Sequence, residues 1–294
     1  MRSLGIFWYQ KISVGLAKDR FSRFSQTPIP GGGSLIDKQR LKLARIRFDL
    51  LFLLISKDLR LRYRGSLFGY LWSMLNPLLQ MMVLTAVFSF LVRFKIENYP
   101  IFLLCGIVLW NLFSQSLTQG ANAIIANGGL IKKVKVPVAI FPTASVASVT
   151  VHFVLSLIAF FAISFFMGHW PRLIWFLIPI YLFVFIGFIW GITLAISSLN
   201  VLFKDIGHVL DPILQLCFYG TPIIYPISVL PESIANIVAL NPLTHFVGSI
   251  RTLYFDYQVP NATTTIYCFG LMTLSLLFGS FTYYKTRDKF VFRL

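Results

Sequence analysis

The chain has 294 residues, of which 57% are hydrophobic and only 12% are charged, and its formal net charge is +16. A soluble domain carries about 25% charged residues, so this composition excludes a soluble protein and indicates an integral membrane protein. The three cysteines show no CxxC spacing and the four histidines are scattered, so neither a disulfide framework nor a metal site is predicted.

The N-terminal part of the chain differs in composition from the rest. Residues 1–45 are basic and contain the linker-like stretch TPIPGGGS at 27–34, with too few apolar residues to build a core. We therefore interpret 1–45 as a cytosolic N-terminal extension. In residues 46–65, apolar side chains such as Phe48 and Phe52 recur at helical spacing between charged residues. This pattern predicts an amphipathic helix that lies in the membrane plane.

Six apolar stretches in residues 66–290 are long enough to cross a membrane, which takes about 20 residues per helix. The predicted spans are 67–92, 101–125, 139–167, 173–199, 207–226 and 264–284. An even number of spans places both termini on one side of the membrane. Of the 26 Lys and Arg residues, 22 then lie on that side and four on the other, so the positive-inside rule predicts two cytoplasmic termini. The basic charge reflects this topology and contact with membrane lipids, and no nucleic acid partner is expected.

The stretch TPIIYPISVLP at 221–231 is too apolar for a water-exposed loop and too rich in proline for one continuous helix. It opens a segment, 221–262, on the outer side of the predicted topology. Non-helical backbone at membrane depth is tolerated only against protein or a water-filled cavity. We expect two short re-entrant helices here, separated at Asn241-Pro242, that act as an outer gate. An interfacial hairpin without a moving part is the alternative.

Four blocks of the sequence carry a resemblance to a known family. They are KDLRLRYRGSLFGYLWSMLNPLLQMMV (57–83), GIVLWNLFSQSLTQGANAIIANGGLIKKVKVP (106–137), NVLFKDIGHVLDPILQLCFYGTPIIYPISVLP (200–231) and LNPLTHFVGSIRTLYF (240–255). In this order they resemble the membrane subunit of ABC-2-type exporters, and within that group the permeases for O-antigen, capsule and teichoic acid polysaccharides.

The resemblance implies an all-α membrane protein of the type-2 ABC exporter kind, with six transmembrane helices. It implies a homodimer around a central channel, driven by two separate cytosolic subunits that bind ATP and Mg²⁺. The expected cargo is a polysaccharide on undecaprenyl pyrophosphate or a comparable lipid carrier, moved across the bacterial inner membrane.

The residues themselves argue against catalysis by this chain. The sequence contains no GxxxxGK[ST] phosphate loop, so ATP hydrolysis is expected in a separate subunit. Only ten Asp and Glu are present, without an acidic pair or a nucleophile constellation, which argues against a membrane enzyme. An ABC-2 exporter of a drug, a lipid or another small molecule remains the alternative to a polysaccharide exporter.

The loop NGGLIKKVKVP at 127–137 is short and positively charged, and the predicted topology places it in the cytosol. The resemblance implies that this loop is the coupling element that docks on the ATPase. The candidate contacts are Leu130, Ile131, Lys132, Lys133, Val134 and Lys135. The lysines alone would also suit an anchor at the cytosolic membrane surface.

Two further groups of candidates concern the substrate. Arg60, Arg62, Tyr63 and Arg64 lie at the predicted cytosolic lipid boundary, where guanidinium groups suit a pyrophosphate head group. Anchoring to lipids is the alternative for these residues. The candidates for the channel and the outer gate are Trp72, Trp110, Phe113, Tyr219, Pro222, Tyr225, Pro226 and Pro242.

Each of these aromatic rings has two interpretations. Aromatic rings stack on the apolar faces of sugars, whereas packing or lipid contact is the alternative for each ring. Asn111 and Gln115 lie one helical turn apart within a predicted span. Polar side chains at such positions usually face protein or water, so we expect this side of the helix to be shielded from lipid.

Overall fold

The computed structural model describes residues 35–91, 98–133 and 136–294. The chain divides into two units, Met1–Ile46 and Arg47–Leu294. Most of the predicted extension 1–45 therefore lies outside the described residues. Helix α2 extends over Leu35–Tyr63, so it begins earlier than the predicted helix at 46–65. No Gly or Pro lies between these bounds, so the sequence contains nothing that would end the helix at residue 46.

The described residues form helices and turns without a strand, which confirms the predicted all-α fold class. The second unit contains five helices that are long and apolar enough to cross a membrane, counted among the described residues. These five candidate spans are Gly69–Phe88, Tyr99–Ala126, Ile140–Phe166, Leu173–Leu202 and Ala262–Lys289. They coincide closely with five of the six predicted spans, because helix formation in lipid depends on local apolar composition.

These spans and their connections are built from the following elements. The helices of the second unit are α3 (Trp72–Leu91), α4 (Tyr99–Ala126), α5 (Gly128–Ile131), α6 (Ile140–Phe166), α7 (Ile178–Leu202), α8 (Asp205–Tyr219), α9 (Glu232–Ala239), α10 (Pro242–Arg251), α11 (Ala262–Thr286) and α12 (Phe290–Arg293). Short 3-10 turns are η1 (Gly69–Leu71), η2 (Leu173–Leu177), η3 (Ile227–Val229) and η5 (Arg287–Lys289), and η4 (Thr252–Asp256) is a π-helical turn.

The predicted fifth span, 207–226, is not one continuous helix. Helix α8 has 15 residues and ends at Tyr219. At 1.5 Å per residue it is about 22 Å long, short of the roughly 30 Å hydrocarbon core. The chain continues through turns at 220–226 to the short helices α9 and α10. Two short helices are therefore present in this region, whereas their re-entrant placement and the count of six spans stay predictions.

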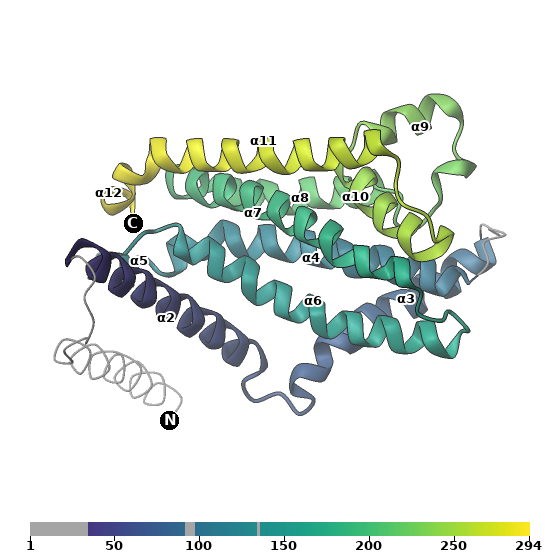
Figure 1. Cartoon of the computed structure of the whole chain (residues 1–294), viewed down its shortest axis with the longest axis horizontal. Coiled ribbons are helices and arrows are strands. Elements are labelled where there is room, and N and C mark those ends of the chain that lie inside the picture. The colour runs from purple at the N-terminus through teal and green to yellow at the C-terminus, as the bar shows by residue number, and fades with distance from the viewer. Residues whose placement is uncertain (1–34, 92–97, 134–135) are drawn as a thin grey trace. The chain divides into compact units, whose positions relative to one another are not determined.

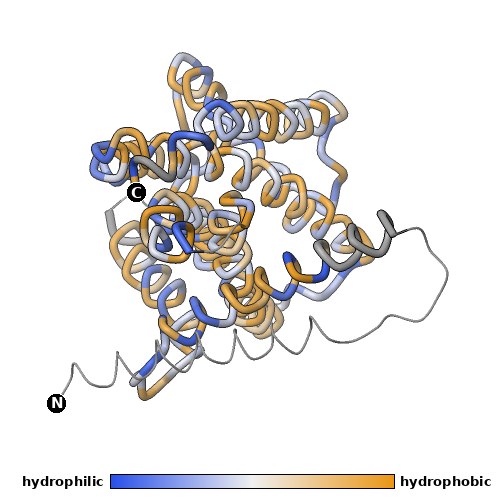
Figure 2. The backbone as a smooth tube through the Cα atoms, turned by 90° about the vertical axis from the view of Figure 1, so that its left-hand side faces the viewer, coloured by the Kyte–Doolittle hydropathy of each residue, from blue (hydrophilic) through white to orange (hydrophobic). Residues whose placement is uncertain are grey.

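The long helices lie alongside one another, with α9 and α10 at one end of the unit and α5 and α12 at the other (Figure 1). Most of the helical tube is hydrophobic (Figure 2). Helix α4 is the most buried candidate span and contacts α3, α6, α7 and α8. It therefore forms the centre against which the site residues are positioned.

Helices α7 and α11 approach each other closely through small residues. A Cβ atom on Gly191 of α7 would lie 2.4 Å from the backbone carbon of Ser275 on α11. A Cβ atom on Gly279 would lie 2.2 Å from the carbonyl oxygen of Gly191. Small residues at such crossings bring helix backbones into direct contact, which supports packing inside a membrane.

Candidate functional site

The 220–226 segment, from Gly220 to Pro226, is a buried and non-helical part of the chain. Thr221, Pro222, Ile223 and Ile224 are buried although no regular helix holds them. Such a segment exposes backbone carbonyl groups that need hydrogen-bond donors when water is excluded. The structure supplies these donors from the start of α4 and from the two ends of α10.

Three side chains donate hydrogen bonds to these carbonyl groups. Arg251, at the end of α10, donates to the carbonyl oxygens of Pro222 and Ile223, the latter at 2.9 Å. Tyr99, at the start of α4, donates its hydroxyl to the carbonyl oxygen of Ile224 at 2.9 Å. The Asn241 amide donates to the carbonyl oxygen of Gly220 at 3.0 Å. The segment thus has a defined shape, which is set by long-range hydrogen bonds.

Asn241 also starts helix α10. Its side-chain oxygen accepts a hydrogen bond from the backbone N–H of Leu243 at 3.0 Å, and Pro242 occupies the first helical turn. This arrangement is a helix N-cap followed by proline, and both residue types are favoured at these positions. Pro242, a predicted gate residue, therefore sets the start of a helix, and Asn241 links that helix to the 220–226 segment.

The predicted aromatic candidates do not form one ladder. Trp110 lies 5.3 Å from Phe218 and 5.7 Å from Phe113, measured between ring centroids, and Phe113 is buried. Trp72 packs on Phe68 at the start of α3. These rings therefore form local packing contacts at separate places in the described unit.

Two tyrosines at the 220–226 segment differ in their exposure to solvent. Tyr219 is exposed, whereas Tyr225 is half-buried and donates its hydroxyl to the carbonyl oxygen of Tyr219 at 2.8 Å. Pro226 is also half-buried and precedes the 3-10 turn η3. Of this group, Tyr219 has the most exposed ring.

A line of polar side chains follows one side of α4. Asn111, Gln115, Thr118 and Asn122 are spaced four, three and four residues apart, so they lie on one side of the helix, and all are at least partly exposed. The Asn111 amide donates to Gln80 of α3 at 3.1 Å. We call these four residues and Gln80 the polar face.

The predicted arginine cluster meets the polar face at one point. Arg60, Arg62 and Arg64 are exposed, and Arg62 donates to the side-chain oxygen of Gln115 at 3.0 Å. Burial raises the pKa of the nearby Asp58 carboxyl, an effect that the positive charges of Lys57 and Arg62 partly offset. Arg62 therefore joins the end of α2 to a polar group inside a candidate span.

Tyr63 has a different environment from the arginines. Its hydroxyl hydrogen-bonds with Ser73 of α3 and with Nδ1 of His152 on α6, the latter at 2.9 Å. Ser73 also hydrogen-bonds with His152 at 3.1 Å. The hydroxyl of Tyr63 is thus engaged within the protein, where it fixes the turn between α2 and α3 to α6.

The predicted coupling loop packs on the chain's own C-terminal region. Ile131 is buried in an apolar cluster, the loop core, whose buried members are Leu54, Ala123, Ile124, Ile131, Phe141, Ala144, Val201 and Phe290. Gly128 lies against Leu294, and Lys57 donates to Asn127 at 3.0 Å. Ile131 is therefore a packing residue in this structure and not an exposed docking contact.

The remaining candidates of this loop lie partly outside the core. Lys132 and Lys133 are exposed, and Leu130 is half-buried. Val134 and Lys135 lie outside the described residues. A partner that docks on this loop would accordingly meet Leu130 and the two lysines.

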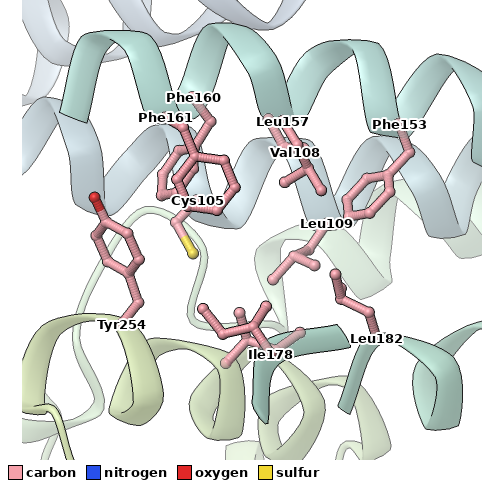
Figure 3. A pocket seen from close by; sticks show the side chains of 11 residues that line it. Cys105, Val108, Leu109, Phe153, Leu157, Phe160, Phe161, Ile178, Leu182 and Tyr254 are labelled. Atoms are coloured by element: carbon pink, nitrogen blue, oxygen red, sulfur yellow. The ribbon is translucent and has the colours of Figure 1, made fainter. Parts of the chain in front are cut away.

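The structure also contains a small apolar cavity, of about 20 Å³, between α4, α6, α7 and η4 (Figure 3). Its lining includes Cys105, Phe153, Leu182 and Tyr254. Ligand sites combine a larger volume with several convergent polar groups. This cavity is therefore a packing gap. Within the described ranges, no three His, Cys, Asp or Glu side chains are grouped as a metal site would require.

Sequence reasoning did not single out Arg251, Tyr99, His152 or Phe290. Arg251 appeared only as a charge on the outer side of the predicted topology. The one available signal was that Arg251 is the single Lys, Arg, Asp or Glu in residues 243–255. Such a charge is costly unless it is satisfied by partners, and the sequence does not name those partners.

Together, the apolar spans and the shielded polar groups define an all-α, multi-pass membrane protein. The chain belongs to the ABC-2 type transporter family, whose model matches residues 49–255. This confirms the resemblance seen in the sequence blocks.

Several characterised relatives are similar over most of the chain. The O-antigen export system permease protein RfbA of Myxococcus xanthus is 32% identical over 82% of this chain and 94% of the relative. RfbA of Klebsiella pneumoniae is 37% identical over 71% of this chain and 81% of the relative. The polysialic acid transport protein KpsM of Escherichia coli is 25% identical over 84% of this chain and 96% of the relative.

Proposed function

We propose that the chain is the membrane subunit of an ATP-driven exporter of lipid-linked polysaccharide, such as an O-antigen, in the bacterial inner membrane. Two copies would enclose the pathway, and two separate ATP-binding subunits would supply the energy and hold ATP and Mg²⁺. Undecaprenyl pyrophosphate or a similar carrier would bear the polymer. Both termini would lie in the cytoplasm.

The observation that carries this proposal is the polar face. Amide side chains within the membrane are energetically unfavourable in contact with lipid, so they usually face protein or water. Here Asn111, Gln115 and Gln80 are partly or fully open on a single copy of the described unit. A water-filled pathway beside α3 and α4 accounts for this exposure, because water can hydrogen-bond with the amides. Sugar hydroxyl groups can hydrogen-bond with the same amides during export.

A second candidate function keeps the fold and changes the cargo to a drug, a lipid or another small molecule. The names of the relatives favour the polysaccharide, because O-antigen, polysialic acid and capsule polysaccharide exporters all appear among them. The amide-rich face supports the same choice, since an apolar cargo would be served better by apolar walls.

Coupling to the ATPase would use the loop at 127–137. Lys132 and Lys133 are exposed beside the half-buried Leu130. The loop core below them is apolar and packed, so a push on the loop would reach α2, α4 and α12 together. The head group of the carrier would enter at Arg60, Arg62 and Arg64, where Arg62 already contacts the polar face.

The test is deletion of the gene in its native host, followed by localisation of the lipid-linked polymer. We expect the polymer to accumulate on the cytosolic side, and plasmid-borne wild-type protein to restore its export. A strain with an inactive partner ATPase should show the same accumulation. Normal surface polymer in the deletion strain would overturn the proposal, and loss of drug efflux in its place would support the second candidate.

A further inference from the structure

The end of α10 places a positive charge inside the protein without an acidic partner. Arg251 is buried, and among the described residues no acidic side chain forms an ion pair with it. An arginine side chain does not lose its proton in proteins, so its charge has to be satisfied where it lies. Its two terminal nitrogens donate to backbone carbonyl groups, whereas the buried Nε has no hydrogen-bond partner among the described residues.

These carbonyl groups belong to two parts of the chain that are far apart in sequence. Arg251 donates to Pro222 and Ile223 of the 220–226 segment, and Nη2 also donates to the carbonyl oxygen of Phe102 on α4 at 2.9 Å. The guanidinium carbon lies 3.5 Å from the centre of the Phe102 ring. One side chain thus binds the segment and α4 at the same time.

The packing around the guanidinium group leaves no spare room. A Cβ atom on Gly106 of α4 would lie 2.7 Å from Nη2 of Arg251 and 3.0 Å from Cγ2 of Ile223. Glycine at this position therefore permits the contact between α4, Arg251 and the segment. Gly248, three residues before Arg251 on α10, has no atom within 4 Å of such a Cβ position. The two glycines offer a matched pair of substitutions.

We propose that Arg251 is a positioning residue for transport: it holds the 220–226 segment against α4 and thereby sets the sealed shape of the pathway. The proposal rests on the proposed function, because it takes the segment to border that pathway. Movement of the segment during transport requires that Arg251 release the Pro222 and Ile223 carbonyls. Lysine cannot replace it fully, since a single ammonium group lacks the planar fork that reaches several acceptors.

The experiment uses the full complex with its ATPase subunits in lipid nanodiscs, where both membrane faces are accessible. A reporter cysteine is introduced by Ile224→Cys, at a side chain that is buried in the structure. Its reaction with a hydrophilic thiol reagent is measured by mass spectrometry of peptides, so that the native cysteines can stay. The rate is compared among the parent, Arg251→Met, Arg251→Lys, Gly106→Ala and Gly248→Ala.

We expect Arg251→Met to increase the labelling rate by about tenfold or more, which corresponds to 1.4 kcal/mol per factor of ten. Arg251→Lys and Gly106→Ala should give intermediate rates, and Gly248→Ala should match the parent. A residue with a merely structural role would lower thermal stability without exposing the reporter at temperatures far below unfolding.

Equal protection of the reporter in Arg251→Met and in the parent would overturn the proposal. If Arg251→Met does not fold, the Gly106→Ala variant tests the proposal, since it keeps the charge of Arg251 and displaces its contact with α4. An unchanged labelling rate in Gly106→Ala would also overturn the proposal. The labelling does not depend on the exported cargo. A failure of the proposed function would therefore appear in the export assay alone and be distinguishable from a failure here.

Discussion

Individual side chains show how differently neighbouring candidates are used in this protein. Arg62 and Tyr63 are adjacent in sequence, yet Arg62 reaches Gln115 of the polar face whereas Tyr63 is hydrogen-bonded to Ser73 and His152. Adjacent residues on a helix point about 100° apart, so one can face the pathway while the other packs. Arg62 thus connects the arginine cluster to the polar face.

A first prediction concerns this division. Arg62→Gln should reduce the export rate more than Arg60→Gln, because Arg62 donates a hydrogen bond to Gln115 of the polar face. The triple Gln variant of Arg60, Arg62 and Arg64 should lose most export and keep membrane insertion. Export is measured by surface polymer, and insertion by detergent extraction. Full export with Lys at all three positions would instead favour lipid anchoring, since Lys lacks the bidentate fork.

A second prediction concerns the coupling loop. Ile131→Asp should destabilise the folded protein strongly, because it leaves an unpaired charge in the loop core, and even Ile131→Ala should cost about 2–5 kcal/mol. Lys132→Glu with Lys133→Glu should keep the thermal stability and weaken co-purification of the ATPase, since both side chains are exposed. Stable Ile131→Asp protein would contradict the packing seen in the structure.

The long helices and the 220–226 segment are held in place by two different kinds of contact. The long helices pack through their own small residues, as at the crossing of α7 and α11, whereas the 220–226 segment depends on side chains from α4 and α10. Helix propensity favours alanine over proline by about 3 kcal/mol per position. Against this, each of the two bonds from the charged Arg251 contributes roughly 1.5–3 kcal/mol, and each neutral bond from Tyr99 and Asn241 roughly 0.5–1.5 kcal/mol, so that together they are comparable with the gain at two positions.

A third prediction follows for the prolines. Replacement of Pro222 and Pro226 by Ala should not by itself extend α8, because the segment's carbonyl groups keep their distant donors. The reporter at Ile224→Cys should stay protected in the Pro222→Ala, Pro226→Ala variant. Rapid labelling of that variant would show that the prolines, and not the hydrogen bonds, maintain the shape of the segment.

A fourth prediction concerns the α7–α11 crossing. Gly191→Ala should lower the melting temperature by several degrees, because the added methyl group meets the backbone at Ser275 and overpacking typically costs about 1–3 kcal/mol. Gly270→Ala on α11 is the control, since its Cβ would meet no atom within 4 Å. The melting temperature is measured on purified protein in detergent. Equal stability of the two variants would mean that this crossing adapts freely.

At the scale of the whole molecule, two kinds of exposed surface have to be told apart. Leu277 of α11 is 64% exposed and apolar, as expected for a lipid-facing residue, whereas Gln80 of α3 is exposed and polar. Both are exposed in a single copy of the described unit. Only the polar surface needs water or a second protein surface beside it.

A fifth prediction uses this contrast. A cysteine introduced by Gln80→Cys should react with a small hydrophilic thiol reagent, and one introduced by Leu277→Cys should not, because thiolates form in water and not in lipid. The measurement is made on the complex in native membranes, opened so that both faces meet the reagent. Reaction at Leu277→Cys alone would reverse the assignment of the two surfaces.

The sequence was informative where structure depends on local composition. Five spans follow from apolar length, and the start of α10 follows from Asn241-Pro242. The site was less predictable because it joins distant residues: Arg251 donates to Phe102, and Ile131 and Phe290 belong to one apolar cluster. The predicted span at 207–226 was too long for a related reason: the apolar stretch used to predict it included Pro222 and the turn around it, which are not helical.

The packing of Phe290 beneath the loop at 128–131 has a consequence for how the protein is made. The loop leaves the ribosome long before Phe290 does, so the loop core lacks one of its buried members until the end of synthesis. The loop core is complete only when this later segment arrives. Assembly with an ATPase would then be delayed until the chain is nearly finished, and truncated chains would be left unassembled and open to proteolysis.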